Sequence, residues 1–135
     1  MNLVSIRMIT DDLDRLVDFY ERVTGVSAVR YPPVFAELHF PSFTLAVGHA
    51  QTTALFGEGS AVPAQNRSLI VEFRVDDVDA EYARLSSFVD EFVQTPTTMP
   101  WGNRSLLLRD PDSNLVNLFT PVTDEAITRT GGQGR

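Results

Sequence analysis

The chain has 135 residues, of which 43% are hydrophobic, 10% aromatic and 21% charged. This length and composition suit one compact domain, or two small halves that share a core, and they exclude a disordered, collagen-like or coiled-coil body. Eighteen acidic and eleven basic side chains give a net charge of −7, which repels a nucleic-acid backbone or an anionic membrane. We therefore expect neither a nucleic-acid partner nor a membrane partner.

Cysteine is absent, which excludes disulfides, thiolate nucleophiles, Cys-ligated zinc and iron–sulfur clusters. The first residues lack the basic and apolar regions of a secretory signal, and no apolar run approaches the roughly 20 residues of a membrane helix. These features predict a soluble, cytoplasmic protein.

An acidic tetrad occurs twice. Residues 11–14 read Asp-Asp-Leu-Asp and residues 76–79 read Asp-Asp-Val-Asp, 65 positions later. Each tetrad follows an alternating strand-like run, over 3–9 or 68–75, and precedes a helix-like run. Because carboxylates at a helix start cap the backbone and suit the helix dipole, we favour capping over metal binding or catalysis. The repeat predicts two structurally equivalent halves.

In the first half, apolar residues recur at helical spacing after the tetrad, namely at Leu13, Leu16, Val17, Tyr20 and Val23. Thr10 or Asp11 is the expected N-cap, and Gly25 suits the position just past the helix. Strands are predicted over 34–40 and 43–47, joined by a tight hairpin at Pro41-Ser42.

In the second half, Asp76 or Asp77 is the expected cap of a helix whose apolar stripe is Val78, Tyr82 and Leu85. Strands are predicted over 88–93, 105–109 and 115–119, with a turn at 110–114. We thus predict one domain built from two β-α-β-β-β repeats, at about 1–50 and 66–120, with a connector at 51–65. The tail, residues 121–135, is expected to be frayed from Thr123.

These two halves, the repeated acidic helix start and the segment Arg-Asp-Pro-Asp-Ser-Asn-Leu-Val-Asn-Leu-Phe at 109–119 resemble the vicinal oxygen chelate superfamily. That superfamily includes glyoxalase I, bleomycin resistance proteins and extradiol dioxygenases. The resemblance covers about residues 3–120, and its most specific part is Pro-Trp-Gly-Asn-Arg-Ser at 100–105. It implies an α+β fold in which two U-shaped mixed sheets face each other around a cavity. Ser113 stands where the pattern usually has glycine, so we expect Asn114 to adopt the left-handed conformation.

The resemblance also implies a metal ligand on the first and last strand of each half. The matching positions hold Ser5, or Val4 after a one-residue slip, together with Ala46, Ile70 and Asn117. These side chains offer at most two weak, neutral oxygens, whereas such sites need imidazole or carboxylate ligands. We therefore expect no metal and no other cofactor.

The two histidines do not supply a substitute site. Glu37 and His39 lie two residues apart on one predicted strand and share a face, but no third ligand is evident. A surface or packing role is favoured for His39, and His49 has no evident partner.

Strand alternation predicts the residues around the cavity. If Ser5 and Ile70 face it, Arg7, Glu72 and Arg74 face it as well, while the apolar residues between them pack against the helices. Arg7 and Glu72 are repeat equivalents, which predicts an ion pair between them. That pair either sets the polarity of the ligand or replaces a lost metal site structurally.

Trp101 is the only tryptophan and lies between Pro100 and Gly102 in a predicted loop. Such a residue is either a lid over the core or a flat platform for a ligand, and we favour the platform. Phe35 and Phe40 are expected in the core, although Phe35 could lie at the rim of a groove. The predicted ligand-binding residues are Ser5, Arg7, Glu72, Arg74, Trp101 and Asn117.

Three functions stay open. The first is a metal-free small-molecule-binding protein resembling bleomycin-type antibiotic resistance proteins, with a cationic or aromatic ligand held in a cavity or dimer groove. The alternative is a glyoxalase-like lyase or isomerase, or a dioxygenase, with a non-standard metal site, or a metal-free enzyme that uses Glu72 or Glu37 as general base. The third is a partner-binding module. A homodimer is expected because a twofold partner would bury exposed sheet edges.

Overall fold

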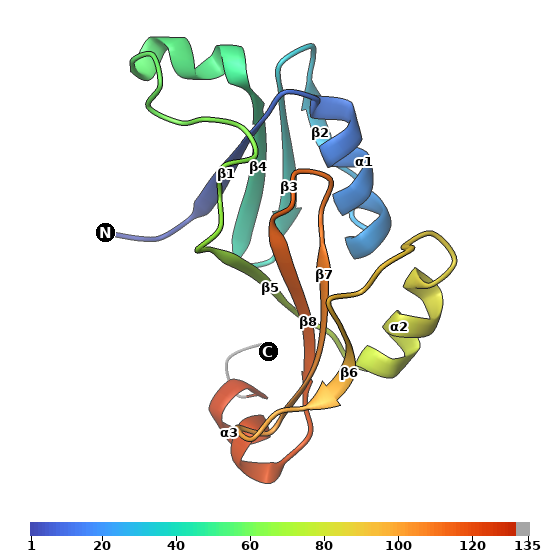
Figure 1. Cartoon of the computed structure of the whole chain (residues 1–135). Coiled ribbons are helices and arrows are strands. Elements are labelled where there is room, and N and C mark those ends of the chain that lie inside the picture. The colour runs from blue at the N-terminus through green and yellow to red at the C-terminus, as the bar shows by residue number, and fades with distance from the viewer. Residues whose placement is uncertain (132–135) are drawn as a thin grey trace. The chain divides into compact units, whose positions relative to one another are not determined.

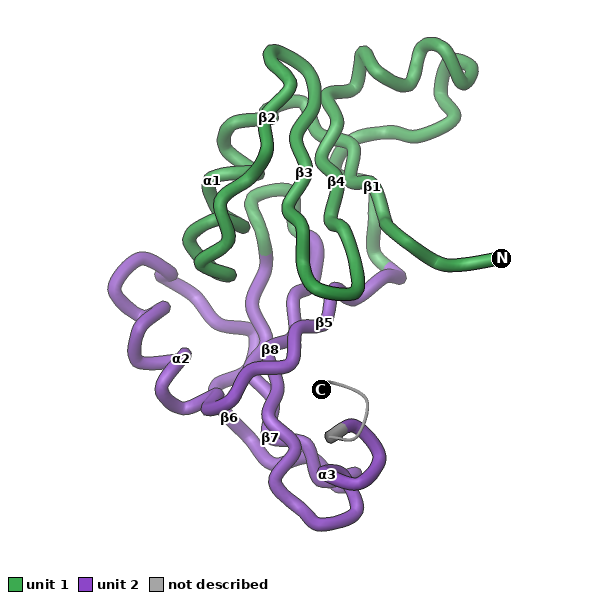
Figure 2. The backbone as a smooth tube through the Cα atoms, turned by 180° about the vertical axis from the view of Figure 1, so that it is seen from behind, with its two compact units in different colours: residues 1–67, 110–113 green, residues 68–109, 114–135 purple. Residues whose placement is uncertain are grey.

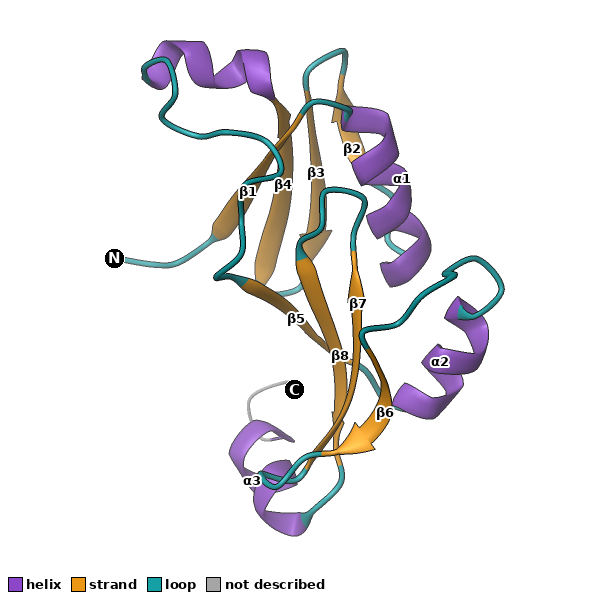
Figure 3. Ribbon diagram, viewed as in Figure 1, coloured by secondary structure: helices purple, strands orange, loops and turns teal. Residues whose placement is uncertain are grey.

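The computed structural model describes residues 1–131. Two compact units are present: unit 1 holds residues 1–67 and 110–113, and unit 2 holds residues 68–109 and the chain from 114 onward (Figure 2). Each unit contains a β-α-β-β-β module whose strands form one four-stranded mixed sheet (Figures 1 and 3). The predicted α+β fold with two repeats is confirmed.

Unit 1 has its sheet in the order β1-β4-β3-β2, with β1 parallel to β4 and the other pairs antiparallel. Its elements are β1 (Ser5–Thr10), α1 (Leu13–Thr24), β2 (Val29–Tyr31), β3 (Phe35–Phe40), β4 (Phe43–His49) and the 3-10 helix η1 (Ala50–Phe56). The predicted tight hairpin at Pro41-Ser42 is confirmed, because Phe40 pairs with Phe43. Helix α1 packs on β3 and β4.

The start of α1 differs by one or two residues from the prediction. Asp12 is the N-cap, and its carboxylate accepts a 3.2 Å hydrogen bond from the backbone N–H of Arg15. Thr10 instead ends β1, and its hydroxyl accepts a 3.1 Å hydrogen bond from the Asp12 N–H. The expectation of Thr10 or Asp11 as cap was wrong because this hydroxyl orients the residue that caps the helix.

The buried face and the end of α1 follow the predicted pattern. Its buried residues are Leu13, Leu16, Val17, Tyr20 and Val23. Gly25 has a left-handed φ of 74° and donates a 2.9 Å hydrogen bond to the carbonyl of Glu21. A residue without a side chain adopts this conformation without strain.

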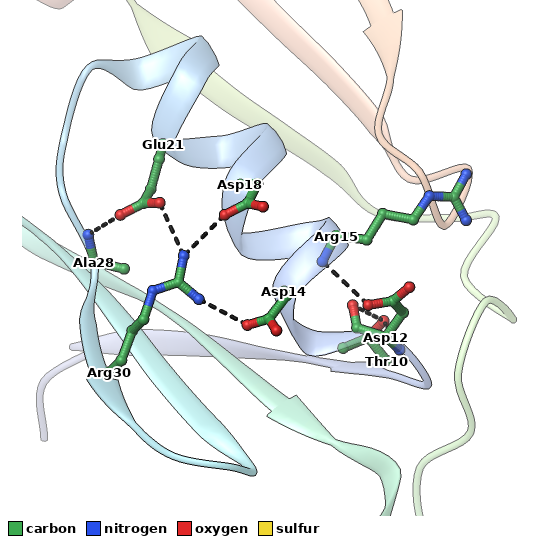
Figure 4. Close-up of polar contacts among 8 residues, drawn as sticks. All are labelled: Thr10, Asp12, Asp14, Arg15, Asp18, Glu21, Ala28 and Arg30. Carbon is green, nitrogen blue, oxygen red and sulfur yellow. Dashed lines mark hydrogen bonds and ion pairs between the residues drawn. The ribbon is translucent and has the colours of Figure 1, made fainter.

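Strand β2 was not predicted, and a cluster of charges joins it to α1 (Figure 4). The guanidinium of Arg30 lies 3.0 Å from Asp14, 2.9 Å from Asp18 and 3.0 Å from Glu21. The other carboxylate oxygen of Glu21 accepts a 2.7 Å hydrogen bond from the backbone N–H of Ala28. These contacts link α1 to a three-residue strand whose residues are all exposed and which pairs with β3.

Unit 2 repeats the arrangement with the strand order β5-β8-β7-β6. Its elements are β5 (Ile70–Arg74), α2 (Val78–Leu85), β6 (Gln94–Thr98), β7 (Asn103–Arg109), β8 (Leu115–Pro121) and α3 (Asp124–Gly131). Asp77 caps α2 as predicted, with its carboxylate 3.1 Å from the backbone nitrogen of Ala80. No helix within residues 1–131 is long and apolar enough to cross a membrane.

The strand predicted over 88–93 lies instead at 94–98. The chain turns back after α2, and Val93 makes its first bond to β7, a 2.8 Å hydrogen bond to the carbonyl of Leu107. Pro96 lies within β6, which is an edge strand with an irregularity between Gln94 and Thr97. Edge strands and bulges tolerate a residue that cannot donate a backbone hydrogen bond.

The C-terminal segment is helical where fraying was expected. Helix α3 covers Asp124–Gly131, and the side chain of Thr123 accepts a 3.2 Å hydrogen bond from the N–H of Ala126. Ala126 is completely buried. The prediction of a frayed tail was therefore wrong for residues 124–131. Residues 132–135 lie outside the described part of the chain.

Ser113, not Asn114, carries the left-handed conformation in the turn between β7 and β8, with a φ of 67°. Its N–H donates a 2.9 Å hydrogen bond to the carbonyl of Asp110. Asn114 is buried. The turn at 110–113 belongs to unit 1.

Candidate functional site

Strand alternation places the predicted site residues on β1 and β5 on the sheet faces that do not carry the buried residues. On β1, Met8 is buried while Ser5 and Arg7 are exposed. On β5, Val71 is buried while Glu72 and Arg74 are exposed. We call the two surfaces the Arg7 face, which carries Ser5, Arg7, Phe35, Glu37 and Ala46, and the Glu72 face, which carries Ile70, Glu72, Arg74, Leu107 and Asn117.

The first and last strands pair in the same way in the two units. Arg7 pairs with Ala46 in unit 1, and Glu72 pairs with Asn117 in unit 2. Ser5 and Ile70 lie on the first strands of the two modules, and Ala46 and Asn117 lie on the last strands. Within residues 1–131, no three His, Cys, Asp or Glu side chains gather as a metal would require.

Glu72 and Asn117 form the central contact of the Glu72 face. The side-chain nitrogen Nδ2 of Asn117 donates a 2.8 Å hydrogen bond to Oε2 of Glu72. Since an ionised carboxylate only accepts, this contact fixes which way the amide points. Asn117 is 9% exposed, and its Oδ1 is buried without a hydrogen-bond partner in the described chain. The Asn117 side chain thus has one polar atom bonded to the Glu72 carboxylate and a second, Oδ1, that is an unsatisfied acceptor.

Arg74, on the same face, holds the end of α3. Its Nη1 donates a 2.8 Å hydrogen bond to the backbone carbonyl of Thr130. Cationic side chains stabilise the last carbonyls of a helix. At least one donor of this predicted ligand-binding residue therefore has a structural role.

Helix α3 also anchors the loop of Trp101. Arg129 donates a 3.0 Å hydrogen bond to the carbonyl of Trp101, and Val122 donates a 2.9 Å hydrogen bond to the carbonyl of Gly102. Gly102 has a φ of 91°, and a Cβ there would collide with Thr123. Trp101 itself is 58% exposed, so a well-held backbone presents its ring to solvent.

On the Arg7 face, the guanidinium of Arg7 lies between two aromatic rings. Its Cζ is 5.3 Å from the ring centroid of Phe35 and 5.5 Å from that of Phe56. Phe35, expected in the core, is half-buried and shares this face. Phe56 was missed because it lies on η1, in the segment predicted as a connector; the adjacent apolar pair Leu55-Phe56 is the only sequence signal for it.

The predicted ion pair between Arg7 and Glu72 would join the two units and stays a prediction. Within its own unit, each residue has a different neighbour. Arg7 contacts aromatic rings, and Glu72 contacts Asn117.

The histidines have local partners. Nε2 of His39 lies 3.6 Å from Oε1 of Glu37, and its Nδ1 lies 3.1 Å from the hydroxyl of Thr44. The side chain of His39 is 53% exposed, which agrees with a surface role. His49, for which no partner was evident, caps η1: its Nδ1 accepts a 3.1 Å hydrogen bond from the N–H of Gln51.

Several solved structures share this fold. A glyoxalase/bleomycin resistance protein/dioxygenase from Nocardioides is 23% identical, with a TM-score of 0.76 over 92% of this chain and 85% of that one. TioX from Micromonospora is 24% identical, with a TM-score of 0.67 over 90% of this chain and 100% of that one. A virulence protein from Salmonella typhimurium is 22% identical, with a TM-score of 0.71 over 90% and 98%.

At these identities the structures establish the fold only. No curated protein matches the chain. The model of one protein family matches residues 2–118, which is most of the chain. By this match and by its two repeated modules, the chain belongs to the Glyoxalase/Bleomycin resistance protein/Dioxygenase superfamily.

Proposed function

We propose that the chain is a metal-free binding protein for a cationic small molecule. Domains of this superfamily typically bind small molecules and often dimerise. In this proposal Glu72 and Asn117 make the main polar contacts, and the protein sequesters its ligand, in the manner of bleomycin-type resistance proteins, without transforming it. The unpartnered Oδ1 of Asn117 beside the Glu72 carboxylate carries the proposal.

The chemistry of this pair favours a donor with positive charge. A buried acceptor without a partner is unfavourable by about 1–3 kcal/mol, and a ligand N–H removes that penalty. The Asn117 amide nitrogen already bonds Glu72, so both groups offer only further acceptor oxygens to a ligand. An ammonium or amidinium group would donate hydrogen bonds to the oxygens of both Asn117 and Glu72. The net charge of −7 favours the approach of such a cation.

The residues at the four metal-ligand positions support binding without a metal. Ser5, Ala46 and Ile70 supply one neutral oxygen between them, and Asn117 uses its amide nitrogen to bond Glu72. Divalent metals in such sites require imidazole or carboxylate ligands. Titration with Ni²⁺, Mn²⁺ and Fe²⁺ should give no stoichiometric uptake, and tight uptake would instead favour a lyase, isomerase or dioxygenase.

The other predicted site residues complete the proposal. Trp101 would stack on a planar ligand, since its ring is exposed on an anchored loop. Arg74, on the Glu72 face of unit 2, would line the remaining surface of this site, while Ser5 and Arg7 lie on the Arg7 face of unit 1 and stay predicted ligand-binding residues there. We also propose a homodimer, which sedimentation at micromolar concentration would test; a monomeric mass would contradict it.

The function is tested with benzamidine, a flat cation, by calorimetry and by the fluorescence of Trp101. We expect saturable binding to the unaltered protein and at least tenfold weaker binding to Glu72→Gln, which keeps an acceptor for Asn117 but removes the charge. Glu91→Gln removes the same charge from an exposed position in the same unit and should bind normally. Equal affinity of Glu72→Gln and Glu91→Gln, or equal affinity for the neutral benzamide, would contradict the proposal.

A further inference from the structure

The Arg7 face holds a guanidinium that is fixed in place by aromatic rings. Phe35 on β3 and Phe56 on η1 each lie within 5.5 Å of Cζ of Arg7. Rings at this distance attract a cation through their π-electrons and reduce the freedom of its side chain. The two rings thus favour the orientation in which the guanidinium lies between them.

A glycine on the neighbouring strand lies beside the Arg7 side chain. Gly48 on β4 pairs with Ile9 on one side and with Phe35 on the other. A Cβ at Gly48 would lie 3.5 Å from Cδ of Arg7 and 2.9 Å from the hydroxyl oxygen of Thr52. The contact with Arg7 would be ordinary van der Waals contact, so a side chain at this position would crowd Thr52 and not Arg7.

The guanidinium donors of Arg7 have no partner among the described residues. Within residues 1–131, Arg7 has ring contacts but no hydrogen bond or ion pair from its side chain. Arg30, in the same unit, contacts three carboxylates. An arginine that stays unpaired in a chain with a net charge of −7 is therefore a candidate anion-binding group.

The surroundings of Arg7 indicate what kind of anion it would bind. The ring of Tyr31 lies 5.9 Å from that of Phe35, and Tyr31 is 50% exposed. Tyr31, Phe35 and Phe56 together provide flat apolar surface next to the guanidinium. A guanidinium binds a carboxylate through two parallel hydrogen bonds, and aromatic rings stack on flat groups.

We propose that Arg7, Phe35 and Phe56 form a second binding site, which takes a carboxylate attached to a flat, apolar group. This site uses residues of unit 1 only. It is independent of the cation site proposed at Glu72 and Asn117 in unit 2, and its ligand carries the opposite charge.

The experiment titrates benzoate into ¹⁵N-labelled protein and follows the Nε–Hε resonance of Arg7, assigned by its loss in Arg7→Lys. Calorimetry gives the affinity in parallel. We expect saturable binding, a shift of the Arg7 resonance, and a reduction in affinity of at least tenfold in Arg7→Met. Arg7→Met keeps an apolar stem to pack against the rings, and its thermal unfolding shows whether it is folded.

Two matched variants separate this site from other effects. Arg15→Met removes the same charge from unit 1, at a side chain that points away from the neighbouring charge cluster (Figure 4), and should bind benzoate normally. Glu72→Gln should also bind benzoate normally, whatever happens to benzamidine. The proposal is overturned if benzoate does not bind, if Arg7→Met and Arg15→Met bind it equally, or if benzamide binds as tightly as benzoate.

Discussion

The hydroxyl of Tyr20 donates a 2.7 Å hydrogen bond to Oδ2 of Asp110, a residue 90 positions away in the sequence. Tyr20 is completely buried and Asp110 is 5% exposed. The other carboxylate oxygen of Asp110 accepts a 2.9 Å hydrogen bond from the N–H of Asp112. In this way a residue of α1 holds the turn at 110–113 within unit 1.

Replacing this hydroxyl should destabilise the protein. Tyr20→Phe removes a donor from a buried carboxylate, which should lower the free energy of unfolding by about 1.5–3 kcal/mol. Urea unfolding measures the difference. Tyr31→Phe is the control, because Tyr31 is half-exposed and should change stability by less than about 0.5 kcal/mol. If the free energy of unfolding falls no more in Tyr20→Phe than in Tyr31→Phe, the hydrogen bond contributes nothing to stability.

The same pair predicts how stability depends on alkaline pH. Burial, and then the negative charge of Asp110, raise the pKa of Tyr20 far above its ordinary value of 10.0. Above pH 10 the unfolded chain loses this proton while the folded protein keeps it, so folding becomes less favourable by about 1.4 kcal/mol per pH unit. Between pH 9 and 11, the free energy of unfolding of the unaltered protein should therefore fall more steeply than that of Tyr20→Phe. Parallel curves for the unaltered protein and Tyr20→Phe would contradict the assignment.

The charge cluster between α1 and β2 should be weak and sensitive to salt. Arg30→Met leaves three carboxylates, Asp14, Asp18 and Glu21, close together without their cation. Because these groups are partly exposed, we expect a loss of at most about 1 kcal/mol at low salt, and a smaller loss at 1 M NaCl. Arg15→Met provides the control for removal of one surface charge. A loss that is the same at both salt concentrations would argue against an electrostatic origin.

A single alanine in the segment after η1 has a strained backbone. Ala64 has a φ of 57°, a left-handed conformation that disfavours residues with a Cβ. Ala64→Gly should therefore raise the free energy of unfolding by about 0.5–1 kcal/mol. Ala61, three residues earlier, is also exposed but has no positive φ, so Ala61→Gly should lower stability. Changes of the same sign in both variants would contradict this explanation.

Local patterns were sufficient to predict the two modules and the faces of their first strands. The acidic tetrads marked both helix starts, and alternation placed Arg7 and Glu72 opposite the helices. These features depend on residues close together in the sequence. The position of Asn117 on the last strand was instead inferred from the resemblance to the superfamily, and the strand register pairs it with Glu72.

Features that depend on distant contacts were missed. Strand β2 has three exposed residues, so no buried pattern marks it, and its pairing with β3 and its ion pairs with α1 join residues distant in the sequence. Helix α3 is polar, and its stability depends on the buried Ala126 and on hydrogen bonds from Arg74 and Arg129. The contact of Phe56 with Arg7 needs η1 to fold back over β1, which no local pattern indicates.

A crystal structure of the protein with benzamidine tests the central claim most directly. We predict an amidinium nitrogen at about 2.7–3.2 Å from Oδ1 of Asn117, with a second hydrogen bond to the Glu72 carboxylate. An amidinium bound elsewhere, or a metal ion coordinated by Asn117 at about 2 Å, would contradict it.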